Sequence, residues 1–242
     1  MRRLILALKA VGAFVASCMV SAALAQVPAP VPAPVLDFVV VDNLGHLPMI
    51  VGAQKGIFKE HGLDVRLKIV KSGTEIVNAL KSKQGRCSGV AGAVEHADIV
   101  QGARSYLVKR GGGYLSYMMV STFQDETIKS KPDLVEKFAL GLAASAHYTR
   151  THRAEAIDLF AKAVPGVDVE ITKKAIQHLS YDLCISKINM AAFNAAQESL
   201  IQLGSSKADK RLDLPKVVLV DYMMKIEKSH PQYFKDLKKV AY

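Results

Sequence analysis

The 242-residue chain contains no tryptophan and only three cysteines. No CxxC pair and no HExxH motif occurs, which argues against a structural zinc module, a redox dithiol and a zincin protease. The sequence also lacks a G-x-S-x-G nucleophile elbow and a nucleotide-binding P-loop, so a serine hydrolase and an ATPase are poorly supported. We therefore predict that the protein is not an enzyme and that it uses no cofactor and no metal.

Long runs of like charge are also absent. The formal net charge is +10, yet no five consecutive residues carry the same sign and only 7% of residues are aromatic. This pattern gives little support to nucleic acid binding. A moderate positive charge suits an anionic ligand, and it equally suits a solvated basic surface. With 50% hydrophobic and 22% charged residues, the composition is that of a globular protein and excludes disorder, collagen repeats and a heptad rod.

The first 25 residues have the pattern of a cleavable signal peptide. Arg2 and Arg3 form a basic start, an apolar stretch follows, and Ala23-Leu24-Ala25 provides an A-x-A site before Gln26. The alternatives are an uncleaved transmembrane anchor and a lipoprotein lipidated at Cys18. Lys9 inside the apolar stretch disfavours the anchor, and the apolar residues after Cys18 disfavour lipidation. We predict cleavage between Ala25 and Gln26 and a periplasmic location.

A short linker separates this signal from the fold. Residues 26–35 alternate proline with small residues and are expected to be an extended polyproline II spacer. Beyond it, two cysteines remain, Cys87 and Cys184. They form either a disulfide that closes a long loop or two buried thiols, and the sequence leaves both possibilities open.

The next segment has the pattern of alternating strands and helices. Residues 36–41 form an apolar strand, a helix starts at Leu47-Pro48 and ends at Gly62, and residues 63–70 alternate as a half-buried strand. Its inward positions are Leu63, Val65, Leu67 and Ile69, and its outward positions are Asp64, Arg66 and Lys68. Ser72 and Glu75 match a capping box for a short helix through Leu80. The β-α-β-α order predicts a parallel sheet with crossover helices.

The rest of the chain divides into a glycine-rich part and a helical part. Residues 84–123 contain short apolar runs at 105–108 and 117–120, which we interpret as strands joined by turns. After residue 123 the spacing of apolar residues becomes helical. The expected helices are 132–148, 154–163 (stopped by Pro165-Gly166), 168–179, 187–203 (closed by Gly204) and 221–229.

The segment Gln54–Val65 (QKGIFKEHGLDV) resembles a signature of ABC-importer substrate-binding proteins, in the nitrate, sulfonate, taurine and thiamine-precursor group. Three further pieces are similar to segments of this family: the strand and polar loop at 38–46, the capped helix at 72–80, and residues 123–160, where the family returns to its first domain. The similarity covers residues 37–83 and 114–200. It implies an α/β, type-II periplasmic-binding-protein-like fold with a parallel-rich sheet and crossover helices.

The chain is shorter than members of this family, and the missing part is expected in the second lobe. We infer an internal deletion near 84–113, where residues 87–95 resemble the last strand and turn of that lobe. The expected organisation is a signal peptide (1–25), a Pro/Ala linker (26–35), a first-lobe βαβα unit (36–83), a second-lobe remnant or crossover (84–122), and a mainly helical return to the first lobe (123–242).

The resemblance places the ligand at the carboxyl ends of the parallel strands. The candidate contacts are Asn43, Gly45 and His46 in the first loop, Ser72, Gly73 and Thr74 at the start of the helix that follows the second strand, and Glu95 from the second lobe. The helix start offers N–H groups and a positive dipole end to an anion. The alternatives are that Ser72 only caps its helix, that Asn43 only forms a turn, and that His46 is solvated or bonded locally.

The resemblance implies a periplasmic solute-binding component of an ABC importer, acting as a monomer with a permease and an ATPase as partners. Its solute would be small and anionic or polar, such as a sulfonate, nitrate, taurine or a pyrimidine precursor. One alternative is a truncated family remnant that does not transport solute or that serves in protein interactions. A thiamine-pyrimidine-synthase-like enzyme is less favoured, because the sequence lacks the cysteine cluster of that branch.

Overall fold

A computed structural model describes residues 32–82, 87–91, 119–179, 181–183, 187–204 and 207–237. The described part belongs to one compact unit that begins at Ala33. The predicted signal peptide, most of the predicted linker, the apolar run at 105–108, Cys184 and Glu95 lie outside the described residues. Within the described part, no helix is both long enough and apolar enough to span a membrane.

The described strands form one sheet. They are β1 (Val35–Val41), β2 (Asp64–Val70), β3 (Cys87–Ala91) and β4 (Met119–Phe123), arranged in the order β2-β1-β3-β4. β1 is parallel to both β2 and β3, whereas β4 is antiparallel to β3. The predicted parallel β-α-β-α opening is therefore confirmed. The described strands of the segment 84–122 lie in the same sheet as the first two strands.

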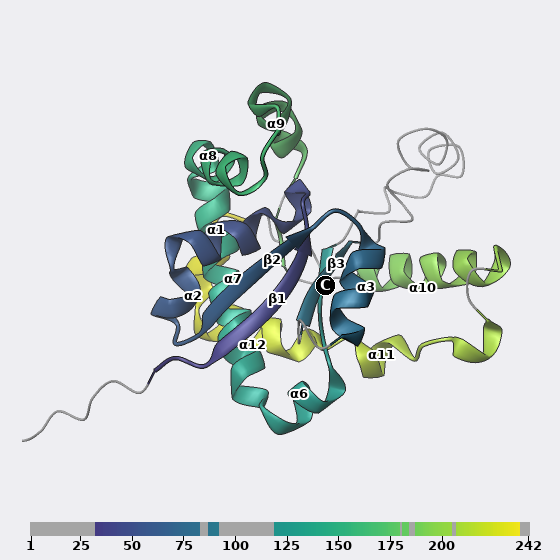
Figure 1. The fold of residues 1–242 in the computed structure, drawn as a ribbon. Coiled ribbons are helices and arrows are strands. Elements are labelled where there is room, and N and C mark those ends of the chain that lie inside the picture. Colours follow the sequence, from purple (N-terminus) through teal and green to yellow (C-terminus); the bar gives the residue numbers. More distant parts are fainter. Residues whose placement is uncertain are drawn as a thin grey trace, which may run out of the picture. The chain divides into compact units, whose positions relative to one another are not determined.

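Ten α-helices lie within the described residues, and most occupy the predicted positions (Figure 1). Short 3₁₀ turns adjoin several of them, including η1 (Leu44–His46), η3 (Ile176–His178), η4 (Ala208–Lys210) and η5 (Pro231–Tyr233). The helices are α1 (Leu47–Lys55), α2 (Ile57–Glu60), α3 (Gly73–Lys81), α6 (Asp125–Ser130), α7 (Pro132–Thr151), α8 (Arg153–Ala163), α9 (Val169–Ala175), α10 (Lys187–Gln202), α11 (Leu214–Val217) and α12 (Val220–Ser229).

The prediction of a single helix from Leu47 to Gly62 is wrong, because Gly56 divides this segment into two helices, α1 and α2. Gly56 has φ +75°, a left-handed conformation that ends α1, and α2 begins at the next residue. Glycine adopts this conformation without the steric cost that a Cβ atom brings. A second left-handed glycine, Gly62 at φ +76°, then leads into β2 as predicted.

Both faces of β1 are buried. On one face, Leu36, Phe38 and Val40 pack against residues from α1, α2 and α7. On the other face, Val39 packs with the end of β2 and with α3. α3 therefore covers one side of this part of the sheet, while α1, α2 and α7 cover the other (Figure 1).

The outward face of β2 differs from the expectation at its carboxyl end. The alternation holds for Val65, which is buried, and for Arg66 and Lys68, which are exposed. Val70, however, lies on the same strand face as Lys68 and is only 6% exposed, because it packs against Ile76 and Ala79 of α3. The crossover helix thus covers the end of a face that a half-buried strand would leave to solvent.

A second apolar cluster packs α1 against α7 and α8. It is formed by ten buried residues from α1, α2, α7 and α8 and from the segments that follow α8: Leu47, Ile50, Val51, Ile57, Ala144, Ala156, Ile157, Phe160, Val164 and Ile176. α7 contributes to this cluster and to the one that contacts β1, so buried positions surround much of its circumference. The prediction of one apolar face for residues 132–148 is therefore incomplete, because α7 is buried on more than one side.

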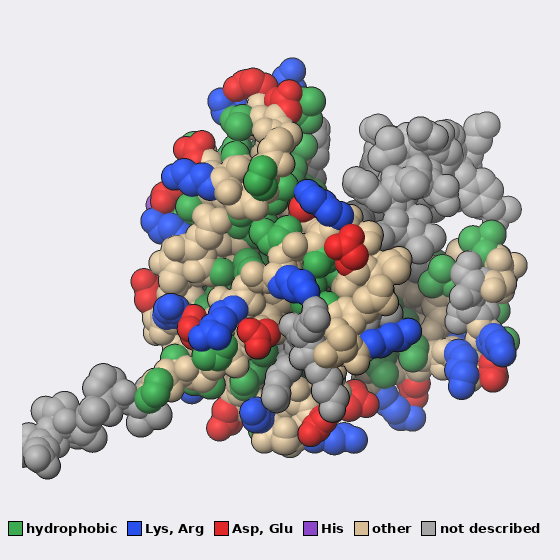
Figure 2. Space-filling view, viewed as in Figure 1, with side chains coloured by type: hydrophobic (Ala, Val, Ile, Leu, Met, Phe, Trp, Pro, Cys, Tyr) green, Lys and Arg blue, Asp and Glu red, His purple; other side chains and the backbone are tan. Residues whose placement is uncertain are grey.

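Charges of both signs are mixed on the surface. On the face shown in Figure 2, Lys and Arg side chains are interspersed with Asp and Glu side chains. Among the described residues, several surface charges are paired, including Lys55 with Glu155 at 2.7 Å and Lys225 with Glu136 at 2.8 Å. Exposed pairs of this kind contribute little stability. This face supports the interpretation of the net positive charge as a solvated surface.

Candidate functional site

The two predicted groups of site residues meet at one edge of the sheet. Val41 is paired with Val70 in the parallel register of β1 and β2, so both strands end side by side. The Asp42 N–H donates to the Val70 carbonyl at 3.2 Å, and Lys71 Nζ lies 2.7 Å from Asp42 Oδ2. The loop after β1 and the turn after β2 are thereby tied together. Parallel topology causes this convergence, because it brings all carboxyl ends to the same edge.

Asn43 organises the loop after β1. Its Oδ1 accepts from the Gly45 N–H at 2.9 Å, and its carbonyl accepts from the His46 N–H at 3.1 Å. Asn43 thus caps η1, which is the turn-forming role expected of an asparagine. Its Nδ2 group donates to no acceptor among the described residues.

His46 is buried, at 2% exposure. Its Nδ1 donates to the Val41 carbonyl at 2.9 Å, so the ring ties the loop back to the end of β1. This contact is the local bond that was the alternative to ligand binding by His46. The geometry gives His46 a role in holding the loop.

The start of α3 is capped by Ser72. Ser72 Oγ accepts from the Glu75 N–H at 3.3 Å, as predicted. The return contact differs from a standard capping box, because the Glu75 carboxylate accepts from the Lys71 N–H at 3.4 Å and from Ser72 Oγ at 3.2 Å. The N–H groups of Gly73 and Thr74 donate to no acceptor among the described residues. Both residues are exposed, and a Cβ added at Gly73 would meet nothing within 4 Å.

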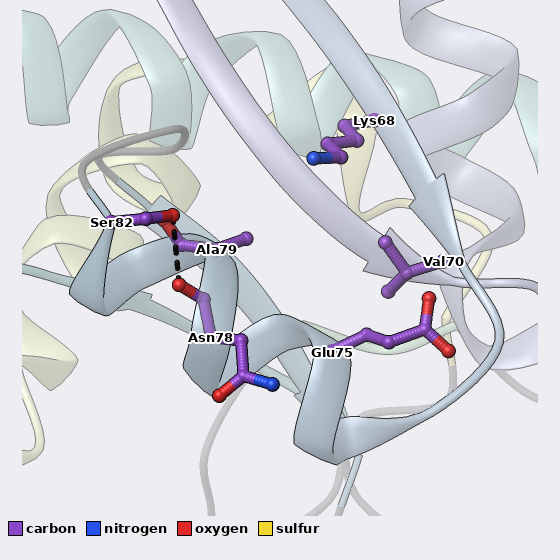
Figure 3. Close-up of a pocket in the computed structure, with 6 residues that line it drawn as sticks. All are labelled: Lys68, Val70, Glu75, Asn78, Ala79 and Ser82. Atoms are coloured by element: carbon purple, nitrogen blue, oxygen red, sulfur yellow. Dashed lines mark hydrogen bonds between the residues drawn. The ribbon is translucent and has the colours of Figure 1, made fainter.

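A pocket of about 340 Å³ lies beside this edge, between β2 and α3 (Figure 3). Its lining is Lys68 and Val70 of β2, together with Glu75, Asn78, Ala79 and Ser82. Lys68, Asn78 and Ser82 were not among the predicted site residues. Ser82 Oγ is already engaged, because it donates to the Asn78 carbonyl at 2.9 Å. The available signal was that Lys68 and Val70, two residues apart, lie on the same face of the strand. This signal points to a pocket only once α3 is known to cover that face.

Glu95, the predicted contact from the second lobe, lies outside the described residues. Among the residues that are described, no three His, Cys, Asp or Glu side chains are grouped so that they could hold a metal ion. The site as described therefore consists of backbone N–H groups, amide and hydroxyl side chains and the paired charges of Lys71 and Asp42.

A residue from a distant part of the chain reaches the same loop. The hydroxyl of Tyr181 donates to the Leu44 carbonyl at 2.9 Å. The carbonyl of Tyr181 in turn accepts from Arg150 Nη1 at 2.8 Å. Arg150 belongs to α7, and its side chain is only 6% exposed. No pattern within the sequence pointed to Tyr181 or to Arg150.

Arg150 also anchors the segment that follows α12. Its Nε donates to Asp236 Oδ2 at 2.6 Å, and its Nη2 donates to Asp236 Oδ1 at 2.9 Å and to the Tyr233 carbonyl at 2.5 Å. The hydrogen bonds from the Arg150 guanidinium lower the pKa of Asp236 to about 2. His147 Nδ1 lies 3.3 Å from the same carboxylate. One guanidinium therefore connects the Tyr181 backbone with the segment after α12.

This ion pair predicts a pH dependence of stability. Because the pKa of Asp236 falls from its ordinary value of 3.8 to about 2 on folding, its stabilising contribution is complete above about pH 4 and is lost as the pH falls towards 2. Asp236→Asn should lower the melting temperature at pH 6, and the difference from the wild type should shrink towards pH 2. Thermal melts between pH 6 and 2 test this. Asp221→Asn, at an exposed position of α12, is the matched control and should retain the wild-type pH dependence. A difference that stays constant with pH would contradict the assignment.

No protein-family model and no curated protein matches this sequence. Solved structures do match. A Candida albicans gene product, described as defining a new family with the generic periplasmic binding protein structural fold, has a TM-score of 0.51 at 13% identity, over 81% of this chain and 95% of that one. A zinc-bound ligand-binding component of an ABC-type import system from Staphylococcus aureus has a TM-score of 0.59 at 8% identity, over 79% and 98% of the two chains.

The alkanesulfonate-binding protein SsuA from Xanthomonas axonopodis pv. citri, bound to MOPS, has a TM-score of 0.52 at 10% identity, over 73% of this chain and 94% of that one. At these identities the likeness concerns the fold. The chain therefore has a periplasmic-binding-protein-like α/β fold, as the sequence analysis expected.

Proposed function

We propose that this chain is the solute-binding component of an ABC importer. The observation that carries the proposal is the convergence, at the carboxyl ends of β1 and β2, of the Asn43 amide and the exposed N–H groups of Gly73 and Thr74. In open α/β folds, ligands bind at this edge of the sheet. The fold likeness to ligand-binding components of import systems supports the same assignment.

The chemistry of this edge suits a small anionic or polar solute. Gly73 and Thr74 lie in the first turn of α3, where unpaired N–H groups and the positive end of the helix dipole attract an anion. The carboxylates of Asp42 and Glu75 lie at the same edge and can accept from an ammonium or amino group. Taurine and aminopyrimidines carry an amino group as well as acceptor atoms, so they would use both the carboxylates and the N–H groups. A simple sulfonate or nitrate would use only the N–H groups at the helix start.

The remaining parts of the proposal follow from the role. A binding component has no energy source of its own, and the sequence contains no P-loop, so a separate ATPase and a permease would drive import. Residues 1–25 would direct export to the periplasm, with cleavage between Ala25 and Gln26. The proposed ligand set is Asn43, Gly45, His46, Ser72, Gly73, Thr74 and Glu95, with His46 acting through the loop that it holds.

Thermal melts of the purified chain test the proposal. Nitrate, alkanesulfonates, taurine and aminopyrimidines would be added singly to the protein. A ligand present at a hundred times its Kd adds roughly 2.7 kcal/mol to the free energy of unfolding, which is a rise of about 5–10 °C in melting temperature for a chain of this size. A rise with one solute class identifies the ligand. Melts that no panel member changes would contradict solute binding and favour a remnant without transport activity.

A proline substitution tests the helix start as the anion contact. Gly73→Pro removes one N–H at the first position of α3, where proline is tolerated, and Ser72 already has an extended backbone that suits a following proline. We expect the bound anion to lose one charge-assisted hydrogen bond, which weakens binding by about 10- to 100-fold. Gly73→Ala keeps the N–H and should bind like the wild type. Calorimetric titration with the solute found above measures both, and equal affinities for the two variants would refute this contact.

A further inference from the structure

Tyr181 has an unusual backbone conformation. Its φ is +50°, and no other non-glycine residue in the part of the chain that the structure describes has a positive φ. For a bulky L-residue the left-handed region is sterically unfavourable, so surrounding contacts must hold it there. Two of these contacts are the hydrogen bonds at the two ends of the residue.

The backbone end of Tyr181 is held by Arg150. The guanidinium donates to the Tyr181 carbonyl at 2.8 Å, and the same group makes two hydrogen bonds to Asp236. Because the Arg150 side chain is nearly inaccessible to solvent, its direction is fixed by these partners. The Tyr181 carbonyl is therefore held by a side chain at the end of α7 whose own position is fixed.

The ring end of Tyr181 reaches the loop after β1. The ring packs against the apolar cluster of α1, α7 and α8, together with Leu44. Burial raises the pKa of the hydroxyl, which therefore stays protonated and remains a donor. Its acceptor is the Leu44 carbonyl, which also accepts from the N–H of Leu47. Leu44 stands between Asn43 and Gly45, so this hydrogen bond acts within the proposed ligand loop.

We infer that Tyr181 is a positioning residue, whose hydroxyl holds the Leu44 carbonyl and thereby sets the conformation of the loop Asn43–His46 for solute binding. The consequence for binding rests on the proposed function; the effect on the loop does not. Tyr181 lies 137 residues from Leu44 in the sequence, so the return part of the chain would shape a loop of the opening βαβα unit. A purely structural tyrosine would stabilise the whole unit without acting selectively on this loop.

Tyr181→Phe in the full chain tests the inference, because it removes the hydroxyl and keeps the ring. Hydrogen exchange would be followed at four amides that hydrogen bonds hold in the loop: Asn43, Gly45, His46 and Leu47. One net hydrogen bond is worth enough for these amides to exchange about three- to tenfold faster. The amide of Ser82, which donates to the Asn78 carbonyl at 2.9 Å in α3, should exchange as in the wild type.

Tyr148→Phe is the matched control. It also removes a tyrosine hydroxyl, which donates to Glu155 of α8 and not to the loop. It should leave the four loop amides unchanged. Where a solute has been identified, Tyr181→Phe should weaken its binding by about three- to tenfold, and Tyr148→Phe should not.

The outcomes separate this inference from the proposed function. If no solute binds the wild type, the proposed function fails, and the exchange data still decide whether Tyr181 holds the loop. Loop exchange in Tyr181→Phe that equals the wild type overturns the inference. So does faster exchange throughout the core, since that result assigns the hydroxyl to global stability. An identified solute that binds Tyr181→Phe with wild-type affinity refutes the positioning role in binding.

Discussion

Replacing Phe138 with alanine is expected to lower the free energy of unfolding by about 3–5 kcal/mol. Phe138 is 2% exposed and lies between three other phenylalanine rings. Its ring stacks on Phe38 of β1 at a centroid distance of 5.1 Å and on Phe58 of α2 at 5.7 Å, and it meets the edge of Phe123 of β4 at 5.0 Å. Truncation removes all three contacts and leaves a cavity between helices and sheet.

Chemical denaturation with urea measures this loss. Phe138→Leu keeps much of the volume and should cost clearly less than Phe138→Ala. The matched control is Phe193→Ala in α10, where the residue is only half-buried, with an expected loss of less than about 2 kcal/mol. Equal losses at Phe138 and Phe193 would show that the four-ring cluster is not the centre of the core.

Gly52→Ala is expected to destabilise the fold by about 3 kcal/mol or more, although alanine is the better helix former. Gly52 lies in α1, where this helix contacts α7. A Cβ atom added there would lie 2.1 Å from Ser145 Oγ and 2.5 Å from Phe58 Cε2. Ser145 is fully buried and donates to the Gly141 carbonyl at 2.6 Å, so its hydroxyl can move aside only by breaking this hydrogen bond. Either this loss or a separation of the two helices destabilises the fold.

Thermal melts test this prediction, with an expected fall in melting temperature of roughly 6–12 °C. Gly73→Ala is the control of identical chemistry, and it should be neutral or slightly stabilising because its new methyl group meets nothing within 4 Å. Adding Ser145→Gly to Gly52→Ala should recover part of the loss, because it removes two of the three nearest atoms. Additive losses in the double variant would argue against close contact at this crossing.

Local sequence signals predicted much of the fold. Pro165-Gly166 ends α8 and Ser72 caps α3, as predicted. Each signal acts over at most four residues, through a backbone conformation or a single hydrogen bond, so it can be read without knowledge of distant contacts. The parallel pairing of β1 with β2 followed from the same signals, because a β-α-β unit is parallel and brings the carboxyl ends of its strands together. The place of β3 beside β1 and the antiparallel direction of β4 were not predicted.

The sequence predicted where the candidate residues come together, and it predicted their contacts only in part. The sequence determined that Asn43 and Gly73 follow adjacent strands, and parallel pairing then places them at one edge. It did not determine that His46 would be buried against the Val41 carbonyl, since a loop histidine can equally be solvated. Nor did it indicate that α3 would cover the end of β2 and form a pocket beside Lys68.

The sequence by itself thus determined most of the helices and strands, the cap of α3 and the sheet edge at which the candidate residues lie, because those depend on neighbouring residues. Only the tertiary structure decided the contacts between distant residues: the four phenylalanine rings, the approach of Gly52 to Ser145, and the path from Arg150 through Tyr181 to Leu44. Such contacts leave no periodic pattern in the sequence, since they depend on how whole helices pack in three dimensions.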